Sequence, residues 1–100
     1  MSPVTQFALR NTVAEVLRSL AERGGPLKTA LEVTTIVQYA GYDVRRTAVK
    51  RALEHLVTKG EAGALPLLCE RNGHVVTRVH YGTQARVDAV RRELKEKEAL

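Results

Sequence analysis

The chain has 100 residues and a mass of 11.1 kDa, which leaves room for one domain with a single small core. Apolar residues make up 44% of the sequence and charged residues 27%, a balance that is typical of soluble globular proteins and excludes disordered, collagen-like and membrane compositions. Sixteen Lys and Arg against eleven Asp and Glu give a net charge of +5 and an isoelectric point near 9.8, which favours a polyanionic partner.

Cys69 is the only cysteine, so an intrachain disulfide and a cysteine-based zinc finger are excluded. The first residues lack the basic flank and apolar run of an export signal, and no apolar run reaches the roughly 18 residues of a membrane span. We therefore expect a cytoplasmic protein that does not insert into membranes.

A first helix is predicted over residues 12–23, because apolar residues recur there at helical spacing. Thr12 and Glu15 fit a capping box at its start, and the run Gly24-Gly25-Pro26 ends it. For residues 1–11 an extra turn, a separate helix and an N-terminal arm all remain open.

Two further helices are predicted in close succession. Thr29 and Glu32 form a second possible capping box before an apolar pattern that ends at Gly41. After a three-residue turn, Asp43 is expected to cap a third helix over residues 44–59. This third helix has one apolar stripe, and a polar and basic face opposite to it.

A β-hairpin is predicted next, with strands over residues 65–70 and 75–81 and the two-residue turn Asn72-Gly73. Antiparallel pairing about that turn puts Leu68, Val75, Val79 and Tyr81 on one face, and Arg71, His74, Arg78 and His80 on the other. We expect the first face to cover the core and the second to form a basic surface.

This order of elements over residues 12–82 resembles the winged helix-turn-helix family, which occurs among bacterial, archaeal and phage regulators. The most telling features are an Ala-Gly turn at Gly41, Thr47 near the start of the third helix, Leu53-x-x-Leu56, and a closing Lys-Gly at Gly60. The resemblance implies an α+β fold whose third helix enters the major groove of double-stranded DNA and whose hairpin, the wing, lies on an adjacent groove or the backbone. The residues that the resemblance assigns to DNA contact are Arg45, Arg46, Thr47, Lys50 and Arg51 in the helix and Arg71, Asn72, His74 and Arg78 in the wing.

The chemistry of these side chains agrees with that role. Arginine donates bidentate pairs to guanine, threonine contacts base edges, and lysine neutralises phosphate. The plainer alternatives are that Lys50 and Arg51 form only a solvated helix surface, or that Arg45 and Arg46 pair with Asp43 or Glu32.

Other chemistry is not indicated by the sequence. His55, His74 and His80 lack metal-ligand spacing, and neither a nucleophile elbow nor a phosphate-binding glycine loop occurs. Cys69 fits a small buried residue, and the alternative is a redox-sensing thiol beside Arg71. We expect no enzymatic activity, no metal or other cofactor and no small-molecule ligand.

The segment 83–100 is predicted to form a fourth helix. Val87, Val90 and Leu94 make a narrow apolar stripe that suits packing against one partner helix. We expect a homodimer seam there, the alternatives being that the helix folds back on the first helix or frays into solvent.

The sequence thus favours a dimeric, DNA-binding transcriptional regulator, with repression the role expected of so small a chain. One alternative is a winged-helix module that docks on an acidic protein through the same basic face. Another is a plasmid or phage replication or partition protein that binds DNA with the same fold.

Overall fold

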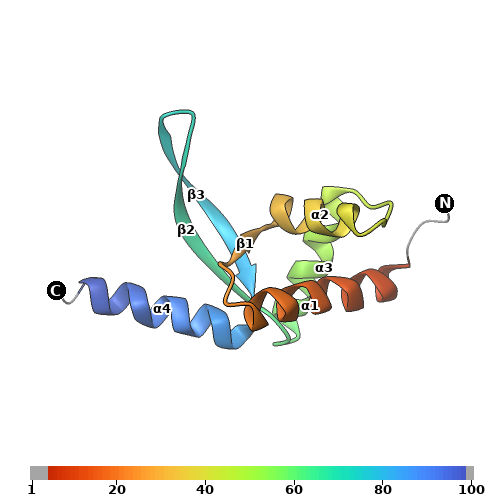
Figure 1. The fold of residues 1–100 in the computed structure, drawn as a ribbon, viewed down its shortest axis with the longest axis horizontal. Helices are drawn as coiled ribbons and strands as arrows, with labels where there is room; N and C mark the ends of the chain where they lie inside the picture. The colour runs from red at the N-terminus through yellow and green to blue at the C-terminus, as the bar shows by residue number, and fades with distance from the viewer. Residues whose placement is uncertain (1–4, 99–100) are drawn as a thin grey trace.

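The computed structural model describes residues 5–98, which form four helices and a three-stranded antiparallel sheet (Figure 1). The elements are α1 (Gln6–Glu22), β1 (Lys28–Thr29), α2 (Ala30–Tyr39), α3 (Arg46–Thr58), β2 (Gly63–Arg71), β3 (His74–Gly82) and α4 (Gln84–Glu98). The α+β class is confirmed, and three helices followed by a hairpin and a C-terminal helix are the architecture of a winged helix. None of the helices in residues 5–98 has the length and apolar character needed to cross a membrane.

Helix α1 begins at Gln6, so the predicted start at Thr12 is wrong. Thr5 caps the helix by accepting a hydrogen bond from the Ala8 amide at 3.2 Å. The Thr12 hydroxyl instead donates to the Ala8 carbonyl within the helix at 3.0 Å. The physical reason is Leu9, which extends the buried stripe one turn earlier and makes residues 6–11 part of the core-forming helix.

Helix α2 begins as predicted, with a complete capping box. The Glu32 amide donates to the Thr29 hydroxyl at 3.2 Å, and the Thr29 amide donates to the Glu32 carboxylate at 3.0 Å. Its predicted end is also confirmed, because Gly41 follows the last turn with a φ of +100°.

Helix α3 begins at Arg46 rather than at residue 44, and Asp43 does not cap it. The N-cap position is Arg45, which makes no side-chain capping bond. Val44 explains the later start, because its side chain is buried in the core and its carbonyl accepts a hydrogen bond from the Gln38 side chain at 2.9 Å. These two contacts hold residue 44 outside the helix, so the turn between α2 and α3 is longer than predicted.

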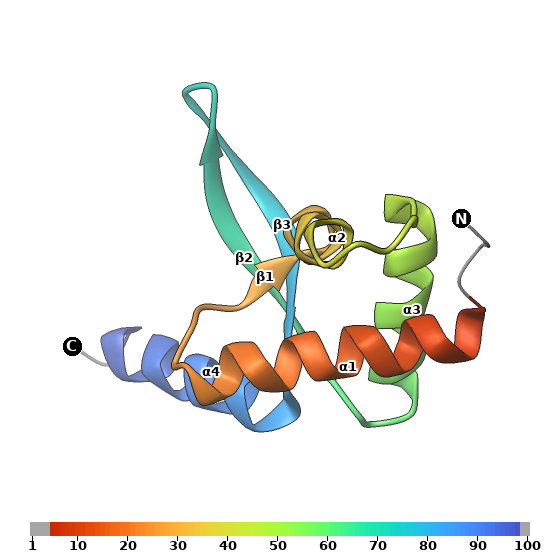
Figure 2. The ribbon, with the colours of Figure 1, turned by 45° about the vertical axis from the view of Figure 1, so that its right-hand side comes forward.

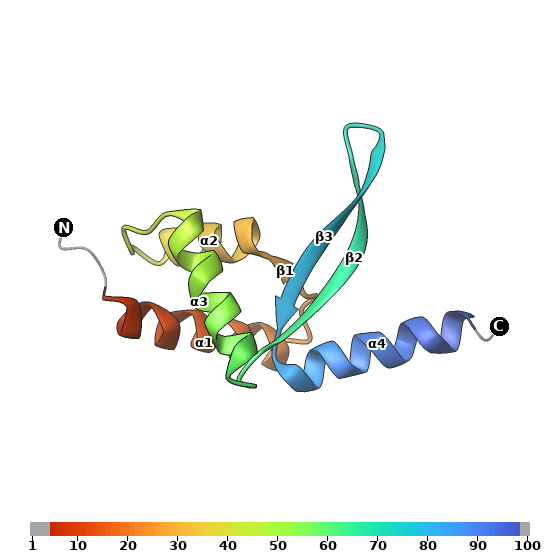
Figure 3. The same cartoon turned by 180° about the vertical axis from the view of Figure 1, so that it is seen from behind.

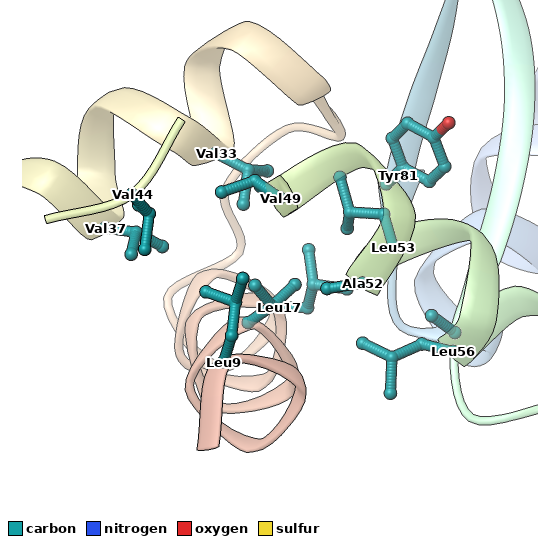
Figure 4. Close-up of a cluster of buried hydrophobic side chains, with 12 residues drawn as sticks. Leu9, Leu17, Val33, Val37, Val44, Val49, Ala52, Leu53, Leu56 and Tyr81 are labelled. Atoms are coloured by element: carbon teal, nitrogen blue, oxygen red, sulfur yellow. The ribbon is translucent and has the colours of Figure 1, made fainter. Parts of the chain in front are cut away.

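The main core lies where α1, α2 and α3 meet the base of the sheet (Figure 4). Val13, Val33, Val37, Val49 and Leu53 are fully buried, and each comes from the apolar stripe of its helix. Tyr81 of β3 closes the cluster from the sheet side. This packing fixes the rotation of α3 and thereby turns its polar side outward.

The β2–β3 hairpin, called the wing below, has the predicted turn. Asn72 and Gly73 have φ values of +52° and +79°, and Arg71 pairs with His74 directly beside them. Positive φ at both central residues defines the two-residue hairpin turn for which Asn-Gly is best suited.

The predicted apolar wing face does turn toward the core, but it covers the core only at the base of the hairpin. Leu68, Val75 and Val79 are 74%, 69% and 46% exposed, and on this face the deeply buried side chain is that of Tyr81 at the base. The reason is that the hairpin extends well beyond the helices (Figures 1 and 2), so its outer part has no layer to pack against. His80, expected on the basic surface, is buried at the base instead.

Helix α4 packs on the sheet and not on α1. Val87 is fully buried in a second cluster with Leu27 and Leu65. A Cβ added at Gly63 would lie 2.8 Å from Val87, so the absence of a side chain in β2 permits this close approach. Val90 packs partly against the same cluster. The C-terminal part of α4 points away from α1–α3 (Figure 3).

Candidate nucleic-acid interface

The outer side of α3 presents the predicted basic and polar residues to solvent. Val49 and Leu53 are fully buried against α1 and α2. Side chains on opposite sides of a helix point in opposite directions, so burial of the apolar side of α3 exposes its polar side to solvent. All four candidates in the helix are exposed: Arg46, Thr47, Lys50 and Arg51. Arg45, at the N-cap position, is exposed as well.

A groove of about 710 Å³ runs between α3, the start of α2 and the wing. It is called the groove below. The charged residues that line it come from three elements: Glu32 from α2, Arg46, Lys50 and Glu54 from α3, and Glu70, Arg71 and Arg78 from the wing. The floor includes Tyr81, which is 5% exposed. The structure therefore brings the basic residues of α3 and of the wing to one concave surface.

The exposed residues of α3 form two rows along the helix. Arg46, Lys50 and Glu54 are spaced four residues apart and line the groove. Thr47 and Arg51 form a second row, which lies outside the groove lining. A ligand that filled the groove would contact the first row, and one that lay across α3 would contact both.

Within residues 5–98 the cations of this surface form no ion pairs, although three carboxylates line the groove with them. Among residues 5–98 the ion pairs are Lys28–Glu32 at 3.7 Å and Asp88–Arg91 at 3.6 Å. The alternative in which Arg45 or Arg46 pairs with Asp43 or Glu32 is therefore wrong. In physical terms, the capping box and Lys28 hold the Glu32 carboxylate at the start of α2.

Two groups that line the groove have shifted pKa values. Burial, with the nearby Glu54 carboxylate as the second cause, raises the pKa of Tyr81 above its ordinary value. For Glu32, burial acts in the opposite direction, but the hydrogen bonds with Thr29 and the charge of Lys28 hold its pKa below the ordinary value. At neutral pH the groove thus contains the ionised Glu32 carboxylate among its cations.

The wing candidates separate into two groups. Arg71 and Arg78 line the groove, whereas Asn72 and His74 lie at the exposed tip and are not part of its lining. The positive φ of Asn72 explains that residue as part of the turn, independently of any ligand. The tip lies far from the helices in all views of the ribbon (Figures 1 to 3).

Contacts of two histidines could not be predicted from spacing. The Nε2 atom of His55 lies 2.7 Å from Nη1 of Arg10, which links α3 to α1. The Nε2 atom of His80 lies 3.6 Å from the sulfur of Cys69, which is only partly buried. Both contacts join residues that are distant in sequence, and nothing local in the sequence signals them.

The three residues predicted to form a dimer seam differ in exposure. Val87 is fully buried in its own chain, and Val90 packs partly against the same cluster. Leu94 is 40% exposed. A dimer through α4 stays a prediction, and Leu94 is the predicted residue whose side chain is most available to a partner.

Within residues 5–98, no three His, Cys, Asp or Glu side chains are grouped so that they could hold a metal ion. In comparisons with known proteins, no family model matches the chain and no curated sequence matches it.

Proposed function

We propose that the protein binds double-stranded DNA as a transcriptional regulator, with binding itself as its activity. The observation that carries the proposal is the groove, which Arg46 and Lys50 of α3 line together with Arg71 and Arg78 of the wing, without ion-pair partners in residues 5–98. DNA supplies a regular array of phosphates, and unpaired Arg and Lys side chains on one concave surface suit such a polyanion.

Both the size and the chemistry of α3 fit a major groove. A helix with its side chains is about 10–12 Å wide and the major groove of B-form DNA is about 12 Å wide. With α3 inserted, its exposed side chains reach base edges or flanking phosphates, namely Arg46, Thr47, Lys50 and Arg51. The wing then follows the backbone or an adjacent groove. Phosphate contacts supply most of the affinity, and a few base contacts set the sequence.

The proposed active form is a homodimer that works in the cytoplasm, associated with the nucleoid. Helix α4 projects from the body with Leu94 exposed, and its side chains from Arg91 to Glu98 are all exposed. Two copies paired there would place two α3 helices on successive turns of DNA, about 34 Å apart, and read a pseudo-palindrome. The same binding mode would serve a plasmid or phage replication or partition protein.

The test is fluorescence anisotropy of a labelled random-sequence duplex at several salt concentrations. We expect a log-log slope of about −4 to −8 per dimer, at ~0.9 per neutralised phosphate. The double variant Lys50→Ala/Arg51→Ala should flatten the slope. The matched control Arg18→Ala/Arg23→Ala removes two exposed cations from the α1 region and should leave it unchanged.

One observation favours a protein-docking module as a second candidate. Leu68, Val75 and Val79 form an exposed apolar face on the wing, which phosphates and base edges would not need. If the duplex is not bound even at low salt, the DNA proposal fails. Substitution of Leu68 and Val75 should then weaken capture of an acidic protein partner.

A further inference from the structure

We infer that Glu54 is a specificity-determining residue. It makes this protein prefer DNA sites in which a cytosine faces the row of Arg46, Lys50 and Glu54 on α3. The inference rests on the proposed DNA binding and names which base one side chain selects. Glu54 is notable because a surface that binds DNA phosphates would favour a cation or a neutral side chain at this position, and Glu54 is a carboxylate.

The position of Glu54 places it among the candidate contacts. It continues the row of Arg46 and Lys50 at the same four-residue spacing, and all three line the groove. From Arg46 to Glu54 the row rises by about 12 Å along the helix, at about 1.5 Å per residue. DNA that contacts both Arg46 and Lys50 therefore brings Glu54 close to its surface as well.

The Glu54 carboxylate has no ion-pair partner among residues 5–98, although Lys50 stands one turn before it. Its charge nevertheless affects the groove, because it contributes to the raised pKa of Tyr81 in the floor. The carboxylate is thus exposed, charged and turned to the same concave surface as the cations.

A carboxylate in this position repels phosphate, so it can interact favourably with DNA only through a hydrogen-bond donor on a base edge. In the major groove the available donors are the amino groups of cytosine and adenine. Adenine presents its amino group beside the N7 acceptor, which a carboxylate cannot satisfy, whereas the N4 amino group of cytosine is the usual partner of Glu. Glu54 therefore accepts from cytosine and disfavours other sites by leaving its charge unpaired.

This arrangement predicts opposite effects on affinity and on selectivity. Removing the charge of Glu54 should strengthen binding to random DNA, because one repulsive group is lost. The same change should remove the preference for cytosine. If Glu54 had a purely structural role, its substitution would not raise the affinity for random DNA while removing the preference for cytosine.

The experiment selects duplexes from a random library with the full-length protein, and compares wild type, Glu54→Ala and Glu54→Gln. Wild type should enrich cytosine at one position of each half-site by at least about fivefold over the other bases. Glu54→Ala should lose that enrichment and bind a random duplex more tightly at low salt. Glu54→Gln should shift the preference toward adenine, because an amide pairs with N6 and N7 of that base. The control Glu15→Gln removes an equal charge from the exposed side of α1 and should leave the base preference unchanged.

The outcomes separate this inference from the proposed function. If the wild-type protein shows no salt-dependent duplex binding, both are overturned. If it binds and Glu54→Ala selects the same sequences as wild type, only the role of Glu54 is overturned. Loss of the cytosine position in Glu54→Ala, with the remaining positions retained, supports it.

Discussion

Helix α3 and the wing carry basic side chains of the same kind, but the protein holds the two elements very differently. Val49 and Leu53 of α3 are fully buried among three helices, whereas Leu68 and Val75 of the wing are mostly exposed. A two-stranded hairpin without a covering layer is only marginally stable. The cations of α3 are therefore held in a defined position, which suits contact with bases. Those of the outer wing are free to adjust, which suits contact with the DNA backbone.

The largest effect we predict contrasts one leucine from each region. Leu53→Ala should lower the free energy of unfolding by about 3 kcal/mol, because the substitution leaves a cavity in the packed core. Leu68→Ala removes the same atoms from an exposed site and should change stability by less than about 0.5 kcal/mol. Chemical denaturation of the two variants checks this. Equal losses would mean that the wing face is buried against a partner in solution.

A somewhat smaller effect is expected where α4 meets the sheet. Gly63→Ala places a methyl group 2.8 Å from the β-branched side chain of Val87, so one of the two elements must shift. We expect a loss of about 1–3 kcal/mol. Hydrogen exchange should quicken in residues 84–98 more than in α1–α3. With Leu68→Ala, in the same strand, exchange in α4 should stay at the wild-type rate. Unchanged exchange in Gly63→Ala would show that α4 is not held by this contact.

The capping box of α2 supports a third prediction, of about 1 kcal/mol. Thr29→Ala removes the hydroxyl that caps the helix and should destabilise the protein by that amount. The folded-state pKa of Glu32 is lowered, so its ionised form stabilises the fold above the ordinary pKa of 4.5, and this contribution is lost as the pH falls through the folded value. Thermal unfolding of wild type and Glu32→Gln from pH 7 to pH 3 should therefore differ most at pH 7 and converge in acid. If the difference in unfolding temperature between wild type and Glu32→Gln is the same at every pH, the ionised form of Glu32 is not what stabilises the fold.

The part of the fold that could be predicted from the sequence is the part that rests on local interactions. The capping box at Thr29, the end of α2 at Gly41 and the turn Asn72-Gly73 each depend on residues within a few positions of each other. The missed start of α1 is also local, since Leu9 stands one turn before Val13, but the start of α3 depends on burial in the core. Asp43 was a good local cap, but burial of Val44 moved the start of α3.

The alternating pattern of the wing shows a second limit. Alternation of apolar and polar residues gives the two faces of a hairpin correctly, and the observed register confirms which residues share a face. It does not say how far along the hairpin a covering layer extends, and here that layer ends near Tyr81. The groove could not be predicted either, because its lining residues Glu32, Glu54 and Glu70 come from three separate elements.

The smallest effect we predict tests whether the wing serves affinity and α3 serves specificity. Arg71→Ala/Arg78→Ala removes two groove cations from each wing and should lower the magnitude of the salt slope by about 2 per protomer, or about 4 per dimer, at ~0.9 per lost phosphate contact. Because a phosphate contact is the same at every sequence, the preferred bases should not change. Lys50→Ala/Arg51→Ala removes the same charge from α3 and should alter the selected sequence as well. If the wing variant changes the preferred bases more than the α3 variant does, the roles are reversed, and the exposed hairpin rather than the packed helix is the element that reads DNA.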